Sequence, residues 1–555
     1  MCITIYLEPH STIYLHSGIL NMSTPNERLA ASLDRLRRLQ QDGRRVFRSA
    51  ELTRVHRERL KKNGFLREII KGWLMSASPG SGPGDTTPWF ASFWEFCAAY
   101  CIYRFGDDWH LSPEQSLMLH AENATIPQQV IVHAPGGANN RIDLPFNTSL
   151  FDLGRKAMPP DADLAVDGPG LRVFRPEAAL VRVPEGFFVR NPIEARVAIA
   201  GIRDPADVLG RLLRDGNSTV AGRLAGAFRR TGRDSDANEI LSTMKSAGYD
   251  VRETDPFEPT QTFSGLATPQ QPPVVGRLRL MWETFREPVI RIFPEAPRLP
   301  EDPEAYLAFV DDIYPNDAYH SLSIEGYRVT PELIERVRAG NWNPDADGAD
   351  RQSHDAMAAR GYWQAFRLVR HDIAEITAGA NPGPLVASRH REWYRELFQP
   401  GVQAGIAEPA ALAGYRNTAV FLRGSRYVPP RHEAVRDAMP ALFDLLGEES
   451  EPSVRAVLGH WLFGYIHPYA DGNGRMARFL MNAMLASGGY PWTVTPVDRR
   501  AEYLSALEQA SVHRDVEPFA CFVASQVEWS MDWRHARMAG QSSAPSSGFL
   551  DSRPS

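Results

Sequence analysis

The spacing of hydrophobic and polar positions predicts helices followed by a ribbon at the front of the chain. In residues 26–75, Asn26-Glu27-Arg28 leads into LAASLDRLRRLQQ, whose apolar residues recur at helical spacing, and a second helix follows in RVHRERLKKNG. Gly64 ends that second segment, where a helix C-cap is expected. FLREIIKGWLM then alternates apolar and polar residues, as the two strands of a small hairpin do.

Residues 89–250 combine both periods and predict an α+β region. Short β-rich runs, QQVIVHA, LRVF and ALVRV, interrupt apolar helical segments, and GRLAGAFRRTGRDSDANEILSTMKSAG returns to helix. No set of residues in this region suggests catalytic chemistry. Segments rich in Pro, Gly, Ser and Thr flank it at 76–88 and 254–275, and both are typical of linkers.

Residues 276–537 have the pattern of amphipathic helices almost throughout, with one strand-like stretch near 415–430. Residues 538–555 are rich in Ser, Gly and Pro, which predicts a disordered tail. Residues 1–25 are interpreted as a leader. Its first 21 residues lack a basic region, and Glu8, Pro9 and His10 interrupt any apolar run, so we do not expect a signal peptide. Met22 is a more natural start, and the leader before it is then not translated.

The composition fits several globular domains. A chain of 555 residues exceeds one ordinary core, and 43% hydrophobic with 23% charged residues is typical of a soluble protein. No apolar run reaches the roughly 18–20 residues that cross a bilayer, so we expect no membrane segment. The fold class is therefore predicted to be multidomain, with an α+β front half and an all-α region at the C-terminal side.

Four cysteines are too few for a disulfide framework in a chain of this size. Cys97 and Cys101 lie four residues apart in FWEFCAAYCIYRF, and we interpret them as small apolar residues on a buried helix face. A redox or metal-binding pair is the alternative, but no second Cys or His pair lies nearby. This cysteine usage indicates a reducing, cytoplasmic location.

Positive charge is concentrated in residues 44–71, where ten Lys or Arg stand against three Glu, in a chain whose net charge is -6. The order of helix, KKNGFLREIIKGW and strand resembles a winged helix-turn-helix, and specifically the N-terminal domain of AbiEi-type antitoxins and related regulators. The resemblance implies DNA binding through residues 44–71, by a helix in the major groove and phosphate neutralisation by Arg and Lys. A solvated basic face used for packing or protein contact is the alternative.

Two apolar helices flank a short loop in the rear half. SVRAVLGHWLFGYI reaches His467, MARFLMNAMLASGG starts just past Gly474, and HPYADGNG lies between them. The backbone N–H groups at the start of the second helix are unpaired, and the helix dipole there favours an anion. Gly472 and Gly474 have no Cβ, so a phosphate can approach the backbone closely. The loop therefore predicts a phosphate-binding site.

Side chains around this loop supply the other parts of a nucleotidyl transfer. Asp471 is a hard oxygen ligand suited to Mg²⁺. His467, with a reference pKa of about 6.5, can accept a hydroxyl proton near neutral pH. Arg475 and Arg478 lie three apart on one helix face and can fork onto phosphate oxygens. A capped helix with a solvated Arg pair explains any one of these residues, but not all of them together.

The loop resembles the Fic family motif HPFx(D/E)GNGRxxR at every specified position except that Tyr469 replaces Phe. The resemblance implies an all-α Fic domain and a protein adenylyltransferase (AMPylator) that uses ATP as its substrate. It implies that His467 is the general base for a Ser, Thr or Tyr hydroxyl of a target protein. It also implies that Asp471 holds Mg²⁺ on the α- and β-phosphates, with the α-phosphorus as the attacked atom.

The same resemblance assigns the rest of the loop to the nucleotide. Asn473 would orient the α-phosphate with help from the backbone N–H groups of Gly472 and Gly474. Arg475 would bind the β- and γ-phosphates, and Arg478 would hold phosphate when no carboxylate neutralises it. Positioning and charge stabilisation supply most of the catalysis in such chemistry.

The adenine site departs from the family pattern. RRAEYLSALEQASVHRDVEPF resembles the family's C-terminal helix, in which a Tyr-Tyr pair and an Ala-Asn pair help to hold adenine. Here the pairs are Tyr503-Leu504 and Ala510-Ser511, so the second Tyr and the Asn are missing. ATP is the favoured nucleotide, and Tyr503 is the remaining residue of this pattern; the base is left open.

A second motif lies upstream of the loop. AVFLRGSRYVPP, residues 419–430, alternates apolar and polar residues and turns at Gly424-Ser425. Fic proteins have a β-hairpin flap here, about 40 residues before the motif His, which clamps an extended target segment by strand addition. The resemblance implies a flap whose target-binding residues are Val420, Phe421, Leu422 and Tyr427. A purely structural hairpin edge is the alternative.

Residues 318–326 are predicted to carry a brake. Ser321-Leu322-Ser323-Ile324-Glu325-Gly326 resembles the family's inhibitory motif (S/T)xxxE(G/N). The resemblance implies that Glu325, on a helix with Ser321 and Gly326, pairs with Arg478 and fills space that the γ-phosphate needs. In some family members the same glutamate aligns a water that removes AMP from a modified target, so a deAMPylase is the alternative.

Three functions for the whole chain remain open at this point. The first is an AMP transferase whose front module binds DNA or a partner. The second is a DNA-binding transcriptional regulator with a nucleotide-sensing Fic domain, and the third is a fused toxin–antitoxin-like unit. Intact His467, Asp471 and Arg475 favour catalysis, because a sensor does not need the base. The sequence names no target protein, and it leaves open a homo-oligomer, which is a common trigger in the family.

Overall fold

The computed structural model describes residues 24–80, 82, 84–257, 271–340 and 354–538. The leader up to residue 23, most of the linker 254–275 and the tail beyond residue 538 lie outside the described residues. By internal contacts the chain divides into two compact units. Among the described residues, the front unit consists of residues 24–80, 82, 84–257 and 271–273 with Phe421–Val428, and the rear unit consists of residues 274–340, 354–420 and 429–538.

The first part of the front unit contains the predicted helices and ribbon. Thr24 caps the first helix in a capping box with Glu27, and Thr53 caps the second by accepting a hydrogen bond from the N–H of His56. The strands form an antiparallel sheet in the order β1-β3-β2. Gly64 adopts a positive φ of 78° just past the second helix, as predicted. The elements are α1 (Pro25–Leu39), β1 (Val46–Arg48), α2 (Arg54–Lys62), β2 (Leu66–Ile70) and β3 (Trp73–Ser76).

The second part of the front unit is the predicted mixture of helices and strands. Its larger sheet has the order β4-β5-β7-β6, in which β5 and β7 run parallel, and β8 pairs with β9. The strands are β4 (His110–Leu111), β5 (Gln129–Ala134), β6 (Asn140–Leu144), β7 (Thr148–Gly154), β8 (Leu164–Asp167) and β9 (Leu171–Phe174). The helices are α3 (Thr87–Phe105), α4 (Pro113–His120), α5 (Pro176–Leu180), α6 (Gly186–Arg190), α7 (Pro192–Ala200), α8 (Ala206–Asp215), α9 (Ser218–Arg230) and α10 (Asp234–Ser246).

Two local predictions in this region have different outcomes. Cys97 and Cys101 are fully buried, unbonded residues of α3, and burial raises the pKa of both thiols, so the interpretation as core residues is confirmed. The run ALVRV was predicted as a strand, and this is wrong, because its first two residues end α5. Pro176 at the first position of that helix supplies a preformed helical φ that the β-rich composition does not reveal.

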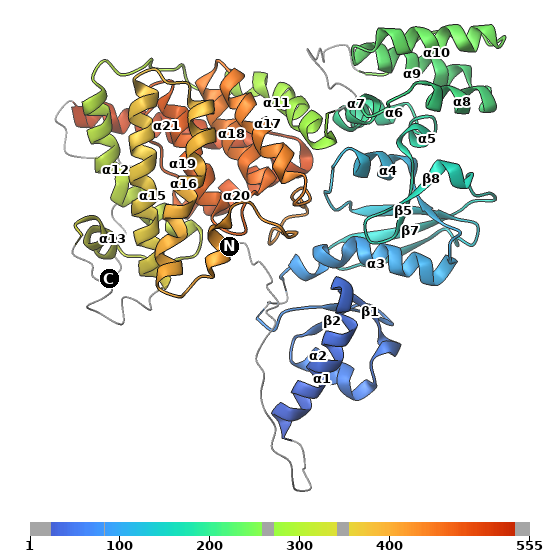
Figure 1. The fold of residues 1–555 in the computed structure, drawn as a ribbon, viewed down its shortest axis with the longest axis horizontal. Coiled ribbons are helices and arrows are strands. Elements are labelled where there is room, and N and C mark those ends of the chain that lie inside the picture. The colour runs from blue at the N-terminus through green and yellow to red at the C-terminus, as the bar shows by residue number, and fades with distance from the viewer. Residues whose placement is uncertain (1–23, 81, 83, 258–270, 341–353, 539–555) are drawn as a thin grey trace. The chain divides into compact units, whose positions relative to one another are not determined.

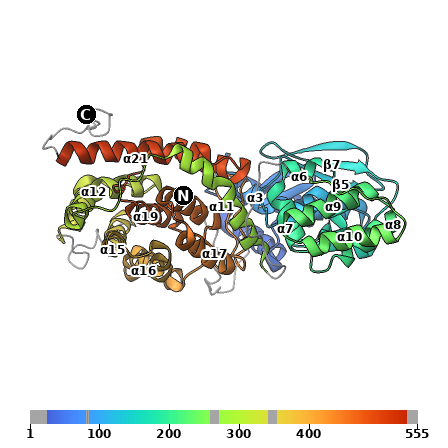
Figure 2. The same cartoon turned by 90° about the horizontal axis from the view of Figure 1, so that it is seen from above.

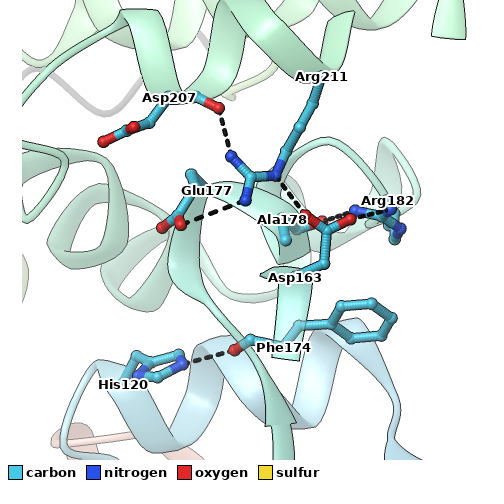
Figure 3. Close-up of polar contacts among 8 residues, drawn as sticks. All are labelled: His120, Asp163, Phe174, Glu177, Ala178, Arg182, Asp207 and Arg211. Atoms are coloured by element: carbon cyan, nitrogen blue, oxygen red, sulfur yellow. Dashed lines mark hydrogen bonds and ion pairs between the residues drawn. The ribbon is translucent and has the colours of Figure 1, made fainter. Parts of the chain in front are cut away.

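A buried carboxylate fastens α5 and α8 to the hairpin β8–β9. The carboxylate of Asp163, which is 1% exposed, forms ion pairs with Arg182 at 2.6 Å and with Arg211 at 2.8 Å (Figure 3). Arg211 also forms an ion pair with Glu177 at 3.4 Å. A buried charge is tolerated only when it is paired in this way. These ion pairs therefore have a structural role.

The rear unit is helical and contains no strand among its described residues. All residues of its helix α19 except the half-buried Gly474 are buried. This helix contacts α12, α15, α16 and α18, and it lies among the helices of the rear unit (Figures 1 and 2). The helices are α11 (Pro273–Ile292), α12 (Pro303–Ile324), α13 (Pro331–Arg338), α15 (His354–Thr377), α16 (Pro382–Gln403), α17 (Val435–Glu448), α18 (Pro452–Ile466), α19 (Asn473–Ala486), α20 (Arg500–Glu508) and α21 (Glu517–Met538).

The strand-like stretch near 415–430 does not form the predicted β-hairpin. These residues are all described, and none of them lies in a strand. A tight turn is present, in which the N–H of Ser425 donates to the carbonyl of Leu422 and Gly424 has a φ of 80°. The turn residue was predicted correctly, but the two arms of the turn do not pair with each other.

No helix in the part of the chain that the structure describes is long and apolar enough to cross a membrane.

Candidate active site

His467 is placed by the end of α18. Its N–H still donates to the carbonyl of Phe463 at 2.9 Å, while its own backbone turns left-handed, with φ 52° and ψ 60°. A non-glycine residue in this conformation is uncommon and is costly unless its surroundings hold it. His467 is 7% exposed, so its imidazole lies inside the protein and not on its surface.

Arg416, which no sequence pattern indicated, holds this turn. Its Nε donates to the carbonyl of His467 at 2.8 Å, and its backbone N–H donates to the carbonyl of Pro468 at 2.8 Å. The same guanidinium, 4% exposed, also binds the carbonyls of Ile466, Thr418 and Pro430. Arg416 thus satisfies carbonyls that the end of α18 leaves unpaired and ties them to both ends of the segment 418–430. Local spacing cannot mark such a residue, because its partners on α18 lie about 50 residues away along the chain.

The imidazole of His467 is oriented to act as a base. Its Nδ1 lies 3.2 Å from the carbonyl of Gly464 and so carries the proton, which leaves the lone pair on Nε2. Burial lowers the pKa of His467 to about 4, against the effect of the bond to Gly464, and the charge of Arg416 lowers it further. The ring is therefore neutral near pH 7 and can accept a proton.

Asn473 and Tyr469 make the loop rigid. The side chain of Asn473 accepts from the N–H of Tyr469 and donates to its carbonyl, both at 2.9 Å. The Tyr469 ring stacks on Tyr394 with centroids 3.7 Å apart and an interplanar angle of 7°. Asn473 holds the loop in this structure, and its contact with the α-phosphate stays a prediction.

A side chain at either glycine of the loop would displace a packed neighbour. A Cβ on Gly472, whose φ is 79°, would lie 2.6 Å from the ring of Phe398. A Cβ on Gly474 would lie 2.2 Å from Oε1 of Glu325. The carboxylate of Glu325 therefore touches the first turn of α19, at the helix end where an anion is favoured.

The two loop arginines are buried and have different neighbours. Arg475, 1% exposed, lies between the rings of Tyr327 and Phe398, 5.1 and 5.0 Å from their centroids. Its Nη2 is 3.5 Å from Asp471. Asp471 also accepts from the N–H of Gly472 at 2.7 Å, and its side chain is half exposed. Asp471 thus presents a carboxylate at the mouth of the loop.

Glu325 pairs with Arg478, as predicted. It is the C-cap residue of α12, and its Oε1 accepts from Nη2 of Arg478 at 2.8 Å. The same guanidinium donates from Nε to Oγ of Ser321 at 2.8 Å and from Nη2 to the Ser321 carbonyl at 3.0 Å. Gly326 follows with a φ of 92°, which lets the chain turn away directly after the carboxylate. The sequence motif and the geometry agree here.

The pair is strongly coupled. Burial alone would raise the pKa of Glu325, but the charges of Arg478 and Arg475 outweigh it and hold that pKa below its usual value. Burial likewise opposes the charge on Arg478, yet Glu325 beside it raises the pKa of the guanidinium. Nη1 of Arg478 is buried and has no hydrogen-bond partner among the described residues. That donor is one that a phosphate oxygen would satisfy.

Asp317 is a second carboxylate of α12, and it was not predicted from the sequence. It is 2% exposed and accepts from the hydroxyl of Tyr362 at 2.6 Å. Burial raises its pKa to about 6, although the Tyr362 bond and the charge of Arg478 lower it. Asp317, Ser321 and Glu325 recur every four residues on one face of α12, and polar residues at that spacing in an apolar helix were the available signal.

Two of the residues that were predicted to lie at the adenine site bond to other protein side chains. Tyr503 is buried, with its hydroxyl 2.8 Å from Nε2 of His460. Ser511 accepts from Nε1 of Trp461 at 3.0 Å, within a π-helical turn over Gln509–His513. Leu504 is 41% exposed. The Ser511 hydroxyl thus serves as a hydrogen-bond acceptor for Trp461. The specificity for adenine as the base stays a prediction.

The predicted flap residues are divided between the two units. Val420 belongs to the rear unit and is 4% exposed, whereas Phe421, Leu422 and Tyr427 belong to the front unit, in which Tyr427 is 2% exposed.

Comparisons with known proteins converge on one family. The profile of the Fic/DOC family matches residues 385–485. "Protein adenylyltransferase Fic" of Nematostella vectensis is 42% identical over 227 residues, which are 40% of this chain and 49% of that protein. "Protein adenylyltransferase fic-1" of Caenorhabditis elegans is 34% identical over 152 residues, 27% of this chain and 28% of that protein.

A solved structure of C. elegans Fic-1 (aa134 - 508) is 19% identical, with a TM-score of 0.36, and covers 63% of this chain and 97% of that chain. The chain spans half or less of the length of the two curated relatives. The match to the Fic/DOC family over residues 385–485 includes the loop from His467 to Arg478.

Proposed function

We propose that the protein transfers AMP from ATP to a Ser, Thr or Tyr hydroxyl of a target protein, and that Glu325 restrains this activity. The curated relatives are named protein adenylyltransferases, and their similarity covers 40% of the chain in the longer match. One observation carries the proposal: a carboxylate that is paired with Arg478 lies against Gly474 at the anion-binding end of α19. That is where a nucleotide phosphate would bind.

The transfer is a displacement at the α-phosphorus. The target hydroxyl oxygen forms a bond to that phosphorus, and the hydroxyl proton passes to Nε2 of His467. The bond from the α-phosphorus to the oxygen that bridges to the β-phosphate breaks, and pyrophosphate leaves. The lowered pKa of His467 keeps its ring neutral near pH 7, and its bond to Gly464 sets the nitrogen that accepts the proton.

The start of α19 would bind the phosphates. Its first backbone N–H groups, including that of Gly474, lie at the helix end that favours an anion, and Arg475 and Arg478 add two buried positive charges. We propose that Asn473 contacts the α-phosphate when nucleotide is bound and that Tyr503 lies beside the base.

Mg²⁺ fits the residues that are present. Asp471 offers one half-exposed carboxylate at the loop mouth, and Mg²⁺ commonly uses one or two carboxylates together with substrate phosphates. Bound there, the ion would neutralise charge on the phosphates.

The test compares four proteins incubated with α-labelled ATP, Mg²⁺ and a cell extract. Glu325→Gly should label protein strongly, wild type weakly, and Glu325→Gly/His467→Ala not at all. Glu448→Gly is a matched control, because it removes an exposed carboxylate from the last position of α17 without touching Arg478. It should behave like wild type. Absence of label from Glu325→Gly would refute the proposal.

Removal of AMP is the alternative direction at the same site. Glu325 lies where it could align a water on a modified target. Protein that has been labelled by the Glu325→Gly variant and then freed of it should keep its label when wild type is added. Release of AMP by wild type, but not by Glu325→Gly, would assign the deAMPylase reaction instead.

DNA binding by the front module is a second proposal. The order β1-β3-β2 next to two helices suits a winged-helix interpretation of residues 26–75. Arg54 and Lys62 on α2 are exposed, whereas Arg59 bonds to Ser32 and Lys61 pairs with Glu68. Salt-sensitive duplex binding by the full chain, weakened by Arg54→Ala/Lys62→Ala, supports this role. Its absence favours the packing alternative.

A further inference from the structure

The segment Phe421–Val428, which the family resemblance identifies with the target-docking flap, packs within the front unit. The chain on either side of it, up to Val420 and from Pro429, belongs to the rear unit. Arg416 binds the carbonyls of Thr418 and Pro430, so both ends of the segment are fixed next to the backbone of His467. A chain segment with such ends is suited to deliver a target hydroxyl to the base.

Two main-chain groups of the segment are hydrogen-bonded to the front unit. The N–H of Ile126 donates to the carbonyl of Arg426 at 2.9 Å, and the N–H of Gly424 donates to Oγ1 of Thr86 at 3.0 Å. Strand addition requires these same kinds of groups to face the incoming peptide. A target strand would therefore compete with Ile126 and Thr86 for the segment.

Side chains strengthen the same contact. The guanidinium of Arg45 lies 5.5 Å from the centroid of the Phe421 ring, at cation–π distance. Val428 packs against the hydrophobic core that includes Phe90 and Val130. Tyr427, 2% exposed, is not presented to solvent. Apolar, cationic and main-chain contacts from the front unit thus reach along the segment from its first residue to its last.

We propose that the N-terminal part of the front unit, within residues 24–257, is an intramolecular ligand of the flap segment 421–428 and restrains target docking independently of Glu325. This inference rests on the proposed function. Glu325 acts on the phosphate site, whereas the front unit withholds the main-chain groups of residues 421–428 from a target. Full activity then requires both the withdrawal of the carboxylate and the release of the segment.

The test changes the front-unit side of the contact and leaves the flap sequence intact. Thr86→Val removes the acceptor of the Gly424 N–H at nearly constant volume, and Thr86 makes no side-chain bond to cap α3. Arg45→Gln weakens the contact with Phe421 as an independent second variant. Thr219→Val is the matched control, since Thr219 is an exposed residue of α9.

Two readouts are taken, with all variants in the Glu325→Gly background. Hydrogen–deuterium exchange at Gly424 should be about fivefold faster in Thr86→Val, as the loss of one hydrogen bond predicts, and unchanged in Thr219→Val. The initial rate of AMP transfer into the proteins that the Glu325→Gly parent labels should rise with it.

Unchanged exchange at residues 421–428 in both Thr86→Val and Arg45→Gln would overturn the inference. Faster exchange with an unchanged or slower transfer rate would also overturn it, and would mean that the front unit presents the flap to targets. A Glu325→Gly parent that labels no protein refutes the proposed function itself. If the Glu325→Gly parent labels protein and Thr86→Val leaves that labelling rate unchanged, the inference about the flap fails and the proposed function stands.

Discussion

Substitution of Gly474 by Ala separates two explanations of the space beside α19. The added Cβ would lie 2.2 Å from Oε1 of Glu325 and 3.2 Å from Nη1 of Arg478, closer than van der Waals contact allows for the carboxylate. Gly474 has no positive φ, so Ala fits its backbone. The change therefore displaces the Glu325 side chain without straining the helix.

The size of the effect follows from the hydrogen bond between Glu325 and Arg478, which the displacement breaks. A hydrogen bond between charged groups contributes about 1.5–3 kcal/mol, and Ala in place of Gly in a helix returns at most about 1 kcal/mol. Gly474→Ala should then lower the free energy of unfolding by about 0.5–2 kcal/mol. The melting temperature should fall by roughly 1–8 °C.

The decisive assay is transfer of labelled AMP. If a phosphate oxygen must enter the space that the Glu325 carboxylate now fills, the added methyl group excludes the carboxylate and the phosphate oxygen alike. Gly474→Ala then stays inactive although the Glu325 side chain is displaced. In the Glu325→Gly background it should cut the transfer rate by about 10- to 100-fold, because a charge-assisted hydrogen bond to phosphate is lost. Gly210→Ala, at a helical glycine with open space around it, is the control for both assays.

One result would refute this reasoning. If Gly474→Ala alone labels protein as strongly as Glu325→Gly, the space accommodates only the brake, and the phosphate binds elsewhere along the loop.

Four further predictions concern the same site. Arg416→Lys should slow AMP transfer by the Glu325→Gly protein and lower its free energy of unfolding by about 2 kcal/mol. The reason is that one ammonium group cannot replace a guanidinium that binds several carbonyls, and transfer rates and thermal melts check this. Transfer should be lost as the pH falls through about 4, where His467 becomes protonated, and a pH–rate profile measures it. Because folding lowers the pKa of His467 from about 6.5 to about 4, its neutral ring contributes fully to the free energy of unfolding above about pH 6.5. That contribution is lost as the pH falls through about 4, and melting temperatures measured across this pH range check it. Ser321→Ala should activate wild type less than Glu325→Gly does, because the Ser321 carbonyl and Glu325 still hold Arg478; labelling rates compare the two.

Several features of the fold followed from local patterns in the sequence. Apolar spacing located the rear helices, the first two helices and the ribbon, because a helix or hairpin buries one face whose residues recur at fixed intervals. The run ALVRV was misassigned, since β-branched residues alone do not outweigh a Pro that starts a helix. The hairpin near residue 425 failed for a different reason: the segment finds its partners in the front unit, which no local pattern reveals.

The chemistry of the site was largely determined by the sequence itself. His467, Asp471, the two glycines and the two arginines lie within twelve residues, so their order alone fixes that they meet at one helix start, and the motif of Glu325 named its partner Arg478. Only the tertiary structure decided the contacts between distant segments. Packing of α12 against α19 brought Glu325 to Gly474 and added Asp317 to the same face, and the fold brought Arg416 to the carbonyls behind His467. Such contacts depend on how buried polar groups find partners across the fold, and spacing along the chain does not encode that.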